Sequence, residues 1–202
     1  MKVKMNIQEY LNRISTLLAR FNDEVSNQNK NGEYGINIHS ENVLIHILNA
    51  IWDCNLENIN YSVGKTAPGI DLLDKEAGIA VQVTSDDSID KIVETLNKVH
   101  NKYYGCSINK LYIFILKNEM IRHYSSVKIK NAIGDLAFTI DDNMIDFSTL
   151  YKHICAKNDM YCIIKIRDLL EEQFSDHVFK ANQKWQEFYE ICKEIIVGNL
   201  ID

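Results

Sequence analysis

The 202-residue sequence contains only one proline and eight glycines, and it has no internal repeat or low-complexity tract. Because flexible linkers are rich in proline, glycine and small polar residues, we expect no such linker within the chain. The sequence also lacks a run of about 18 apolar residues, the length that a membrane-spanning helix needs. Its first 15 residues lack the apolar core of a signal peptide. We therefore expect a cytoplasmic protein without a membrane partner.

Cysteine usage and charge exclude two further classes of protein. The five cysteines are scattered, form no CxxC pair and have no histidine at zinc-finger spacing, so reduced structural thiols are favoured. The formal net charge is −6, which argues against broad, sequence-independent clamping of nucleic acid, because that mode of binding needs a basic face. The most basic segment, residues 117–130, is either a solvated surface or an edge that contacts phosphate. Any contact with nucleic acid must therefore be local or assisted by a metal ion.

The hydrophobic pattern predicts a mixed α/β fold. Hydrophobic residues make up 46% of the chain, which is enough for a substantial core. We expect a mixed β-sheet of four to five strands flanked by helices, with residues 1–145 as one domain and 146–202 as a C-terminal helical extension packed on it. The predicted strands cover residues 58–63, 70–73, 79–83, 110–116 and 136–140. The predicted helices cover residues 6–28, 40–52 with Ser40 as N-cap, 88–102, 147–155 with Asp146 as N-cap, 159–173 and 177–198.

The stretch APGIDLLDKEAGIAVQVTS, residues 67–85, predicts a β-hairpin that carries polar side chains. Pro68 and Gly69 turn the backbone before the first strand, and a polar turn that ends in glycine separates the two strands. Gln82 and Thr84 are two residues apart on the second strand, so both lie on one face. If the turn contains about four residues, Asp71 lies opposite Gln82. A carboxylate, an amide and a hydroxyl then meet at one end of the hairpin.

Two charged side chains from neighbouring helices can reach this end of the hairpin. Glu41 follows the predicted N-cap Ser40, where the helix dipole favours a negative charge, and it shares a helical face with apolar residues. It either serves the helix terminus or points toward the hairpin. Lys91 lies in the first or second turn of the helix after the hairpin, beside the end of the strand that carries Thr84. It is either a solvated helix lysine or a cation at the end of that strand.

This order of elements resembles the core of the restriction-endonuclease-like, PD-(D/E)XK superfamily. The matching order is a helix with an acid, a strand with Asp71, a strand with Gln82-x-Thr84, a helix and a buried strand. The superfamily pattern has an Asp, then Asp/Glu-x-Lys on the next strand, often with a Glu on the preceding helix. In that pattern two carboxylates hold Mg²⁺, which activates water and stabilises the charge on the phosphate, while the lysine orients or deprotonates the nucleophile.

A more specific resemblance is to the SMEK domain, and it covers roughly residues 5–117. PGIDL followed by IAVQVTS is its most specific part. The SMEK domain is a prokaryotic domain expected to have the restriction-endonuclease-like fold, and it is associated with conflict systems that pair it with ABC-type ATPases. The resemblance implies Mg²⁺ or Mn²⁺ as cofactor. Carried over by position, it also implies that the residues that bind the metal are Glu41, Asp71 and Gln82.

The sequence departs from the superfamily pattern at two positions. Gln82 replaces the second carboxylate, so a metal site here has one negative charge fewer and is expected to bind more weakly. Thr84 replaces the lysine, and a neutral hydroxyl supplies no positive charge to a phosphate. Lys91 from the next helix, or Lys65 from the preceding turn, can place an ammonium at the same point. The resemblance together with these departures implies a catalytic set of Asp71, Gln82, Thr84 and Lys91.

Three hypotheses follow from this site. The first is a divalent-metal-dependent nuclease that acts on DNA phosphodiester bonds in prokaryotic anti-phage defence. The second is a catalytically inactive module of the same fold that binds nucleic acid or a partner ABC-type ATPase. The third is a metal-free structural scaffold. The first predicts metal binding that depends on Asp71, and the third predicts no functional cost for changes at Asp71 or Gln82.

Overall fold

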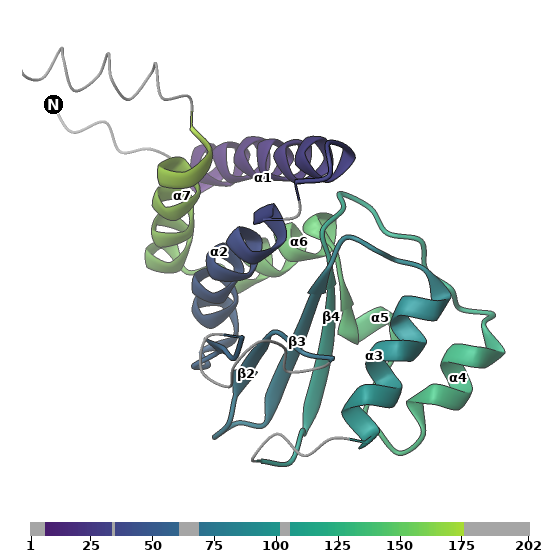
Figure 1. Cartoon of the computed structure of the whole chain (residues 1–202). Helices are drawn as coiled ribbons and strands as arrows, with labels where there is room; N and C mark the ends of the chain where they lie inside the picture. The colour runs from purple at the N-terminus through teal and green to yellow at the C-terminus, as the bar shows by residue number, and fades with distance from the viewer. Residues whose placement is uncertain (1–6, 34, 61–68, 102–105, 176–202) are drawn as a thin grey trace, which may run out of the picture.

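The computed structural model describes residues 7–33, 35–60, 69–101 and 106–175. Within them, one five-stranded sheet has the strand order β1-β2-β3-β4-β5. Strands β2, β3 and β4 are labelled in Figure 1. The first three strands are antiparallel, and β4 and β5 join them in parallel. The strands are β1 (Glu57–Asn58), β2 (Leu72–Asp74), β3 (Ile79–Thr84), β4 (Lys110–Ile115) and β5 (Met144–Ile145). This confirms the predicted α/β class, with a mixed sheet flanked by helices.

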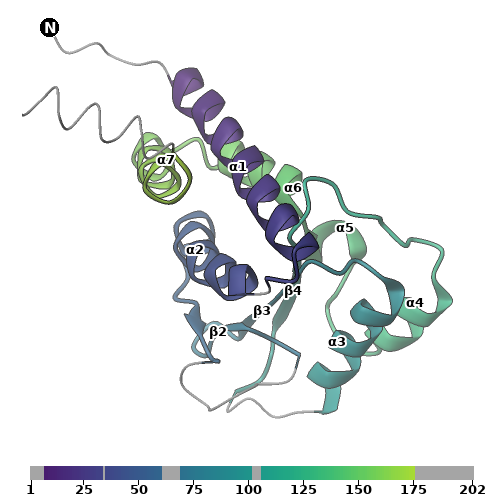
Figure 2. The same cartoon turned by 45° about the horizontal axis from the view of Figure 1, so that its top comes forward.

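Helices cover both faces of the sheet (Figures 1 and 2), and a hydrophobic core lies on each face. Because successive side chains of a strand point to opposite faces, β3 contributes to both cores. Val81 and Val83 join the core beneath α1, α2, α6 and α7. Ala80 joins the core beneath α3 and α4. The helices are α1 (Ile7–Lys30), α2 (Gly35–Trp52), α3 (Ile89–Asn101), α4 (Val127–Ile133), α5 (Ile140–Asn143), α6 (Phe147–Lys157) and α7 (Met160–Phe174).

The buried run KLYIFI forms β4, which lies between β3 and β5 as its apolar composition predicts. Its Phe114 is fully buried and makes an edge contact with Phe147 of α6. The capping of α6 is also confirmed, because the Asp146 side chain accepts a hydrogen bond from the Thr149 backbone N–H. None of the described helices is both long and apolar enough to cross a membrane.

The C-terminal helices pack on the first helix. Arg13 of α1 donates two hydrogen bonds to the Glu171 carboxylate of α7, at 2.5 and 2.9 Å. Phe21 and Phe174 stack with their ring centroids 4.3 Å apart. These contacts join α1 and α7 around one hydrophobic cluster. The predicted helix over residues 177–198 lies outside the described residues, as do residues 61–63 of the predicted strand 58–63.

The predicted start of the second helix is wrong. The helix α2 begins at Gly35, and Ser40 lies buried inside it. A serine within a helix can satisfy its hydroxyl on the carbonyl four residues earlier. Ser40 does this, because its Oγ donates to the Ile36 carbonyl at 2.8 Å. Glu41 therefore lies in the second turn of α2, and the helix dipole at the N-terminus does not account for its position.

The predicted strand over residues 136–140 is also wrong. Thr139 is the N-cap of the short helix α5, and its side chain accepts a hydrogen bond from the Asp142 backbone N–H. Asp141 and Asp142 stand in the first turn, where negative charge is favoured. A threonine followed by two acids is a helix-start signal, and it outweighs the β-propensity of LAFTI. The last strand of the sheet is β5, which begins at Met144.

This cap gives the first testable prediction. Thr139→Ala removes the side-chain acceptor from an exposed residue and is expected to lower the free energy of unfolding by about 1 kcal/mol, a typical cost of losing an N-cap. Urea denaturation of the full chain measures this change. Thr16→Ala is the control, since Thr16 lies within α1 and only its hydroxyl bond to the Asn12 carbonyl is lost. Equal stability of the two variants would contradict the capping role.

Candidate functional site

The hairpin of β2 and β3 positions the candidate site. The Asp74 side chain accepts hydrogen bonds from the backbone N–H groups of Glu76 and Ala77 and so fixes the turn between the strands. The register pairs Leu72 with Val81. Asp71 directly precedes β2, and its backbone N–H donates to the Val81 carbonyl at 2.8 Å.

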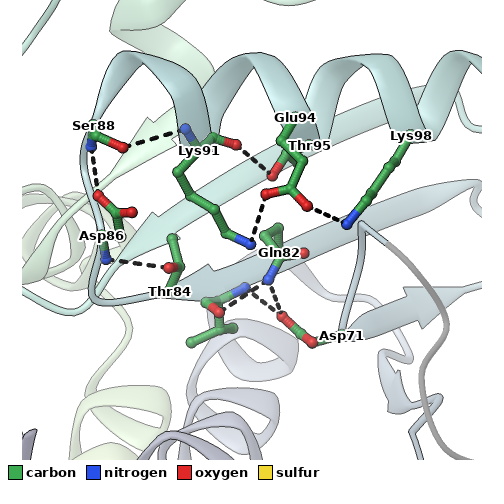
Figure 3. A network of polar contacts seen from close by, with 10 residues as sticks. Asp71, Gln82, Thr84, Asp86, Ser88, Lys91, Glu94, Thr95 and Lys98 are labelled. Carbon is green, nitrogen blue, oxygen red and sulfur yellow. Dashed lines mark hydrogen bonds and ion pairs between the residues drawn. The ribbon is translucent and has the colours of Figure 1, made fainter.

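The carboxylate of Asp71 accepts three hydrogen bonds from the described residues. Its Oδ2 accepts from the Gln82 Nε2 and from the Val83 backbone N–H, both at 2.7 Å. Its Oδ1 accepts from the Asn60 Nδ2 at 3.2 Å. The contact with Gln82 confirms the predicted pairing across the hairpin (Figure 3). Burial raises the pKa of Asp71, and these hydrogen bonds and the charge of Lys91 oppose that rise.

Glu41 of α2 lies at the same place. Its side chain is only 6% exposed, and its Oε2 accepts hydrogen bonds from the Asn58 Nδ2 at 2.8 Å and the Asn60 Nδ2 at 3.2 Å. Burial and the negative charge of Asp71 raise the pKa of Glu41 to about 7. Because the Asn60 nitrogen lies 3.2 Å from an oxygen of each acid, those oxygens are at most twice that distance apart. The structure thus brings together two carboxylates, from α2 and from the start of the hairpin.

Lys91 and Thr84 occupy different positions relative to this pair. Lys91 reaches from α3 toward the strand that carries Gln82 (Figure 3). Its Nζ lies 3.6 Å from the Glu94 carboxylate, and its charge opposes the rise in the pKa of Asp71 that burial causes. The Thr84 Oγ1 accepts from the Asp86 backbone N–H at 3.1 Å, so this hydroxyl takes part in the turn after β3. Lys65, the other lysine considered from the sequence, lies outside the described residues.

The donors at the site are of the kind that a hard cation prefers. Magnesium and manganese bind carboxylate and amide oxygens. Glu41 and Asp71 supply the carboxylates, and Gln82 supplies an amide whose oxygen is available if the side chain turns over. Within the described ranges, no group of three or more His, Cys, Asp or Glu side chains is placed to hold a metal ion. The donor atoms of these residues therefore match the preference of a divalent cation, and the site offers it two carboxylates.

Asn58 and Asn60 are parts of the site that sequence reasoning missed. Asn60 precedes Asp71 by 11 residues and connects it to Glu41 through its side-chain amide, and the Asn58 amide donates a second hydrogen bond to Glu41. The predicted strand over residues 58–63 contained the signal that identifies them. Residues two apart on a strand share a face, so a strand over these residues would point Asn58 and Asn60 the same way. In the structure β1 ends at Asn58, and Asn60 lies in the turn that follows it.

The basic segment 117–130 is held by the protein itself at three of its side chains. Lys117 pairs with the buried carboxylate of Asp87 at 2.5 Å. The His123 ring nitrogen lies 2.8 Å from the Asp87 carbonyl, and Arg122 donates to the Ile140 carbonyl at 2.9 Å. These contacts favour a structural role for the three cations over contact with phosphate.

Comparison with protein families matches residues 13–155 to the SMEK domain. The match begins within α1, ends within α6 and includes Glu41, Asn60, Asp71, Gln82 and Lys91. No curated protein matches the chain, and no solved structure does. The family match covers well over half of the sequence. The chain therefore belongs to the SMEK domain family.

Proposed function

We propose that this protein is a divalent-metal-dependent nuclease with a restriction-endonuclease-like fold, acting on DNA phosphodiester bonds in prokaryotic anti-phage defence. The observation that carries the proposal is the approach of Glu41 and Asp71 to a single amide nitrogen. Burial of Glu41 raises its pKa most, and repulsion from Asp71 at this short separation raises it further. A divalent cation relieves that repulsion. The order α2, β2, β3, α3, β4 supports the fold assignment.

Each side chain of the site has a separate role in the proposed nuclease. Asp71 and Glu41 would hold Mg²⁺ or Mn²⁺, with the Gln82 amide oxygen as a weaker ligand. The bound ion supplies Lewis-acid chemistry, activating water and stabilising charge on the phosphate. Lys91 places its ammonium beside this group and attracts the scissile phosphate. Thr84 lies two residues after Gln82 on β3, and its hydroxyl accepts a hydrogen bond in the turn that leads into α3.

A second function is favoured by the hydrogen bonding of Asp71. Both of its carboxylate oxygens accept hydrogen bonds from protein groups, and its partner across the hairpin is an amide rather than an acid. A site satisfied in this way suits a catalytically inactive module that binds nucleic acid or a partner ABC-type ATPase. This function predicts binding of DNA or the ATPase without cleavage at any metal concentration.

Calorimetric titration of MnCl₂ or MgCl₂ into the full chain, with a DNA cleavage assay on the same samples, tests the proposed function. We expect metal binding and cleavage in the wild-type protein, and cleavage is expected to stop when the metal is removed with EDTA. Asp71→Asn is expected to weaken manganese binding at least tenfold, because it removes one of two negative charges. Asp86→Asn is the control, since Asp86 is exposed beyond the end of β3. Metal binding without cleavage would favour the inactive module, and the absence of both would exclude the nuclease.

A further inference from the structure

Asn60 occupies the space between the two acids of the candidate site. Its Nδ2 lies 3.2 Å from Glu41 Oε2 and 3.2 Å from Asp71 Oδ1. Its backbone N–H donates to Asn58 Oδ1 at 3.0 Å, and Asn58 in turn donates to Glu41 at 2.8 Å. The Asn60 amide is therefore held by its neighbours at the point where two negative groups converge.

The orientation of this amide follows from the chemistry of its neighbours. An ionised carboxylate only accepts hydrogen bonds, so an amide between two of them must present its nitrogen. A divalent cation takes lone pairs, so the same amide next to a cation must present its oxygen. The terminal torsion of asparagine is broad and roughly two-fold, so a half turn exchanges the two atoms at little cost.

We propose that Asn60 is a third ligand of the metal site, presenting its nitrogen to Glu41 and Asp71 in the metal-free protein and its Oδ1 to the cation in the loaded protein. This inference rests on the proposed function, because it needs a site that binds Mg²⁺ or Mn²⁺. It also explains how the two neighbouring acids remain close together in the folded protein when no metal is bound. The partial positive charge of the amide N–H₂ group separates the two carboxylates until a cation replaces it.

A purely structural role for Asn60 predicts a different response to substitution. If the amide only bridges the acids, any change that removes its N–H₂ group destabilises the protein and leaves the metal affinity unchanged. If Asn60 is a ligand, Asn60→Asp adds a negatively charged oxygen donor between the acids. The metal-free protein then loses stability through repulsion among three carboxylates, while its affinity for a cation rises.

The test is calorimetric titration of MnCl₂ into the wild-type chain, Asn60→Asp and Asn60→Ala at pH 7.5, with thermal unfolding measured with and without the metal. We expect Asn60→Asp to bind Mn²⁺ about tenfold more tightly and to unfold at a lower temperature than wild type without metal, a loss that Mn²⁺ reverses. Asn60→Ala is expected to bind about threefold to tenfold more weakly. Asn42→Asp is the matched control, since Asn42 contacts Asn58 from α2 at 3.4 Å. It adds the same charge beside the acids rather than between them.

The outcomes separate this inference from the proposed function. Wild-type binding that is tightened by Asn60→Asp and weakened by Asn60→Ala, with Asn42→Asp close to wild type, supports Asn60 as a ligand. Wild-type binding that neither substitution at Asn60 changes overturns the inference and leaves the proposed function standing. A wild-type chain that binds no Mn²⁺ overturns both. If Asn60→Asp does not fold, unchanged affinity in Asn60→Ala is enough to overturn the inference.

Discussion

The change in the free energy of unfolding caused by Glu41→Gln is expected to be more favourable at pH 8 than at pH 4, by about 1 to 3 kcal/mol. The pKa of Glu41 is about 7 in the folded protein and 4.5 in the reference state. Because the folded state binds the proton more tightly, ionisation of Glu41 costs stability. The penalty is absent below pH 4.5, grows as the pH rises to 7 and is constant above it. Glutamine carries no proton to lose and keeps an oxygen acceptor for Asn58 and Asn60.

Urea denaturation at several pH values between 4 and 8 measures this difference for wild type and Glu41→Gln. Glu57→Gln is the control, because Glu57 is exposed on β1 and is expected to follow the wild-type curve. Added Mn²⁺ gives a second readout. If Glu41 holds the cation, Mn²⁺ at pH 8 stabilises the wild type more than the variant. Parallel stability curves for wild type and Glu41→Gln across this pH range would show that Glu41 carries no ionisation penalty.

The parts of the fold that follow from local pattern were predictable. Strand β4 is an apolar run with β-branched and aromatic residues, and such a run is typical of a strand buried on both faces. The hairpin has a polar turn that ends in a glycine with φ of 66°, a conformation that glycine adopts readily. With the length of that turn set, the pairing of Asp71 with Gln82 follows from strand geometry. Local sequence therefore determined the half of the site that lies on one hairpin.

The parts that depend on competing signals or on tertiary contacts were not predictable in the same way. Ser40 is a good N-cap residue by type, yet the helix continues through it because its hydroxyl bonds to the Ile36 carbonyl. Likewise, LAFTI has high β-propensity, but the cap at Thr139 starts a helix. The link from Glu41 to Asp71 runs through Asn60, which is 19 residues from one acid and 11 from the other. No local pattern specifies such a bridge, because it exists only after α2 packs beside the hairpin.

If the chain is the proposed nuclease, replacing Lys91 by methionine is expected to slow DNA cleavage about 10²- to 10³-fold, the usual cost of removing one preorganised group that stabilises charge in a transition state. Burial raises the pKa of Asp71, and Lys91 is the cation whose charge opposes that rise, so its field reaches the acids of the site. Thr84, two residues after Gln82 on β3, carries no charge. In the proposed nuclease, a phosphate that approaches the site would therefore depend on Lys91 for attraction that the hairpin itself does not provide.

The response of metal binding distinguishes this electrostatic role from general damage to the site. An ammonium close to the acids repels a divalent cation, so Lys91→Met is expected to bind Mn²⁺ at least as tightly as wild type while cleaving far more slowly. Lys98→Met is the matched control, because Lys98 lies on the same helix and also pairs with Glu94. Cleavage rates and calorimetric titrations on the three proteins measure both effects. Equal cleavage by the two methionine variants would mean that Lys91 does not act on the phosphate. A cation elsewhere in the chain would then have to supply the charge, and Lys65 would be the next residue to replace.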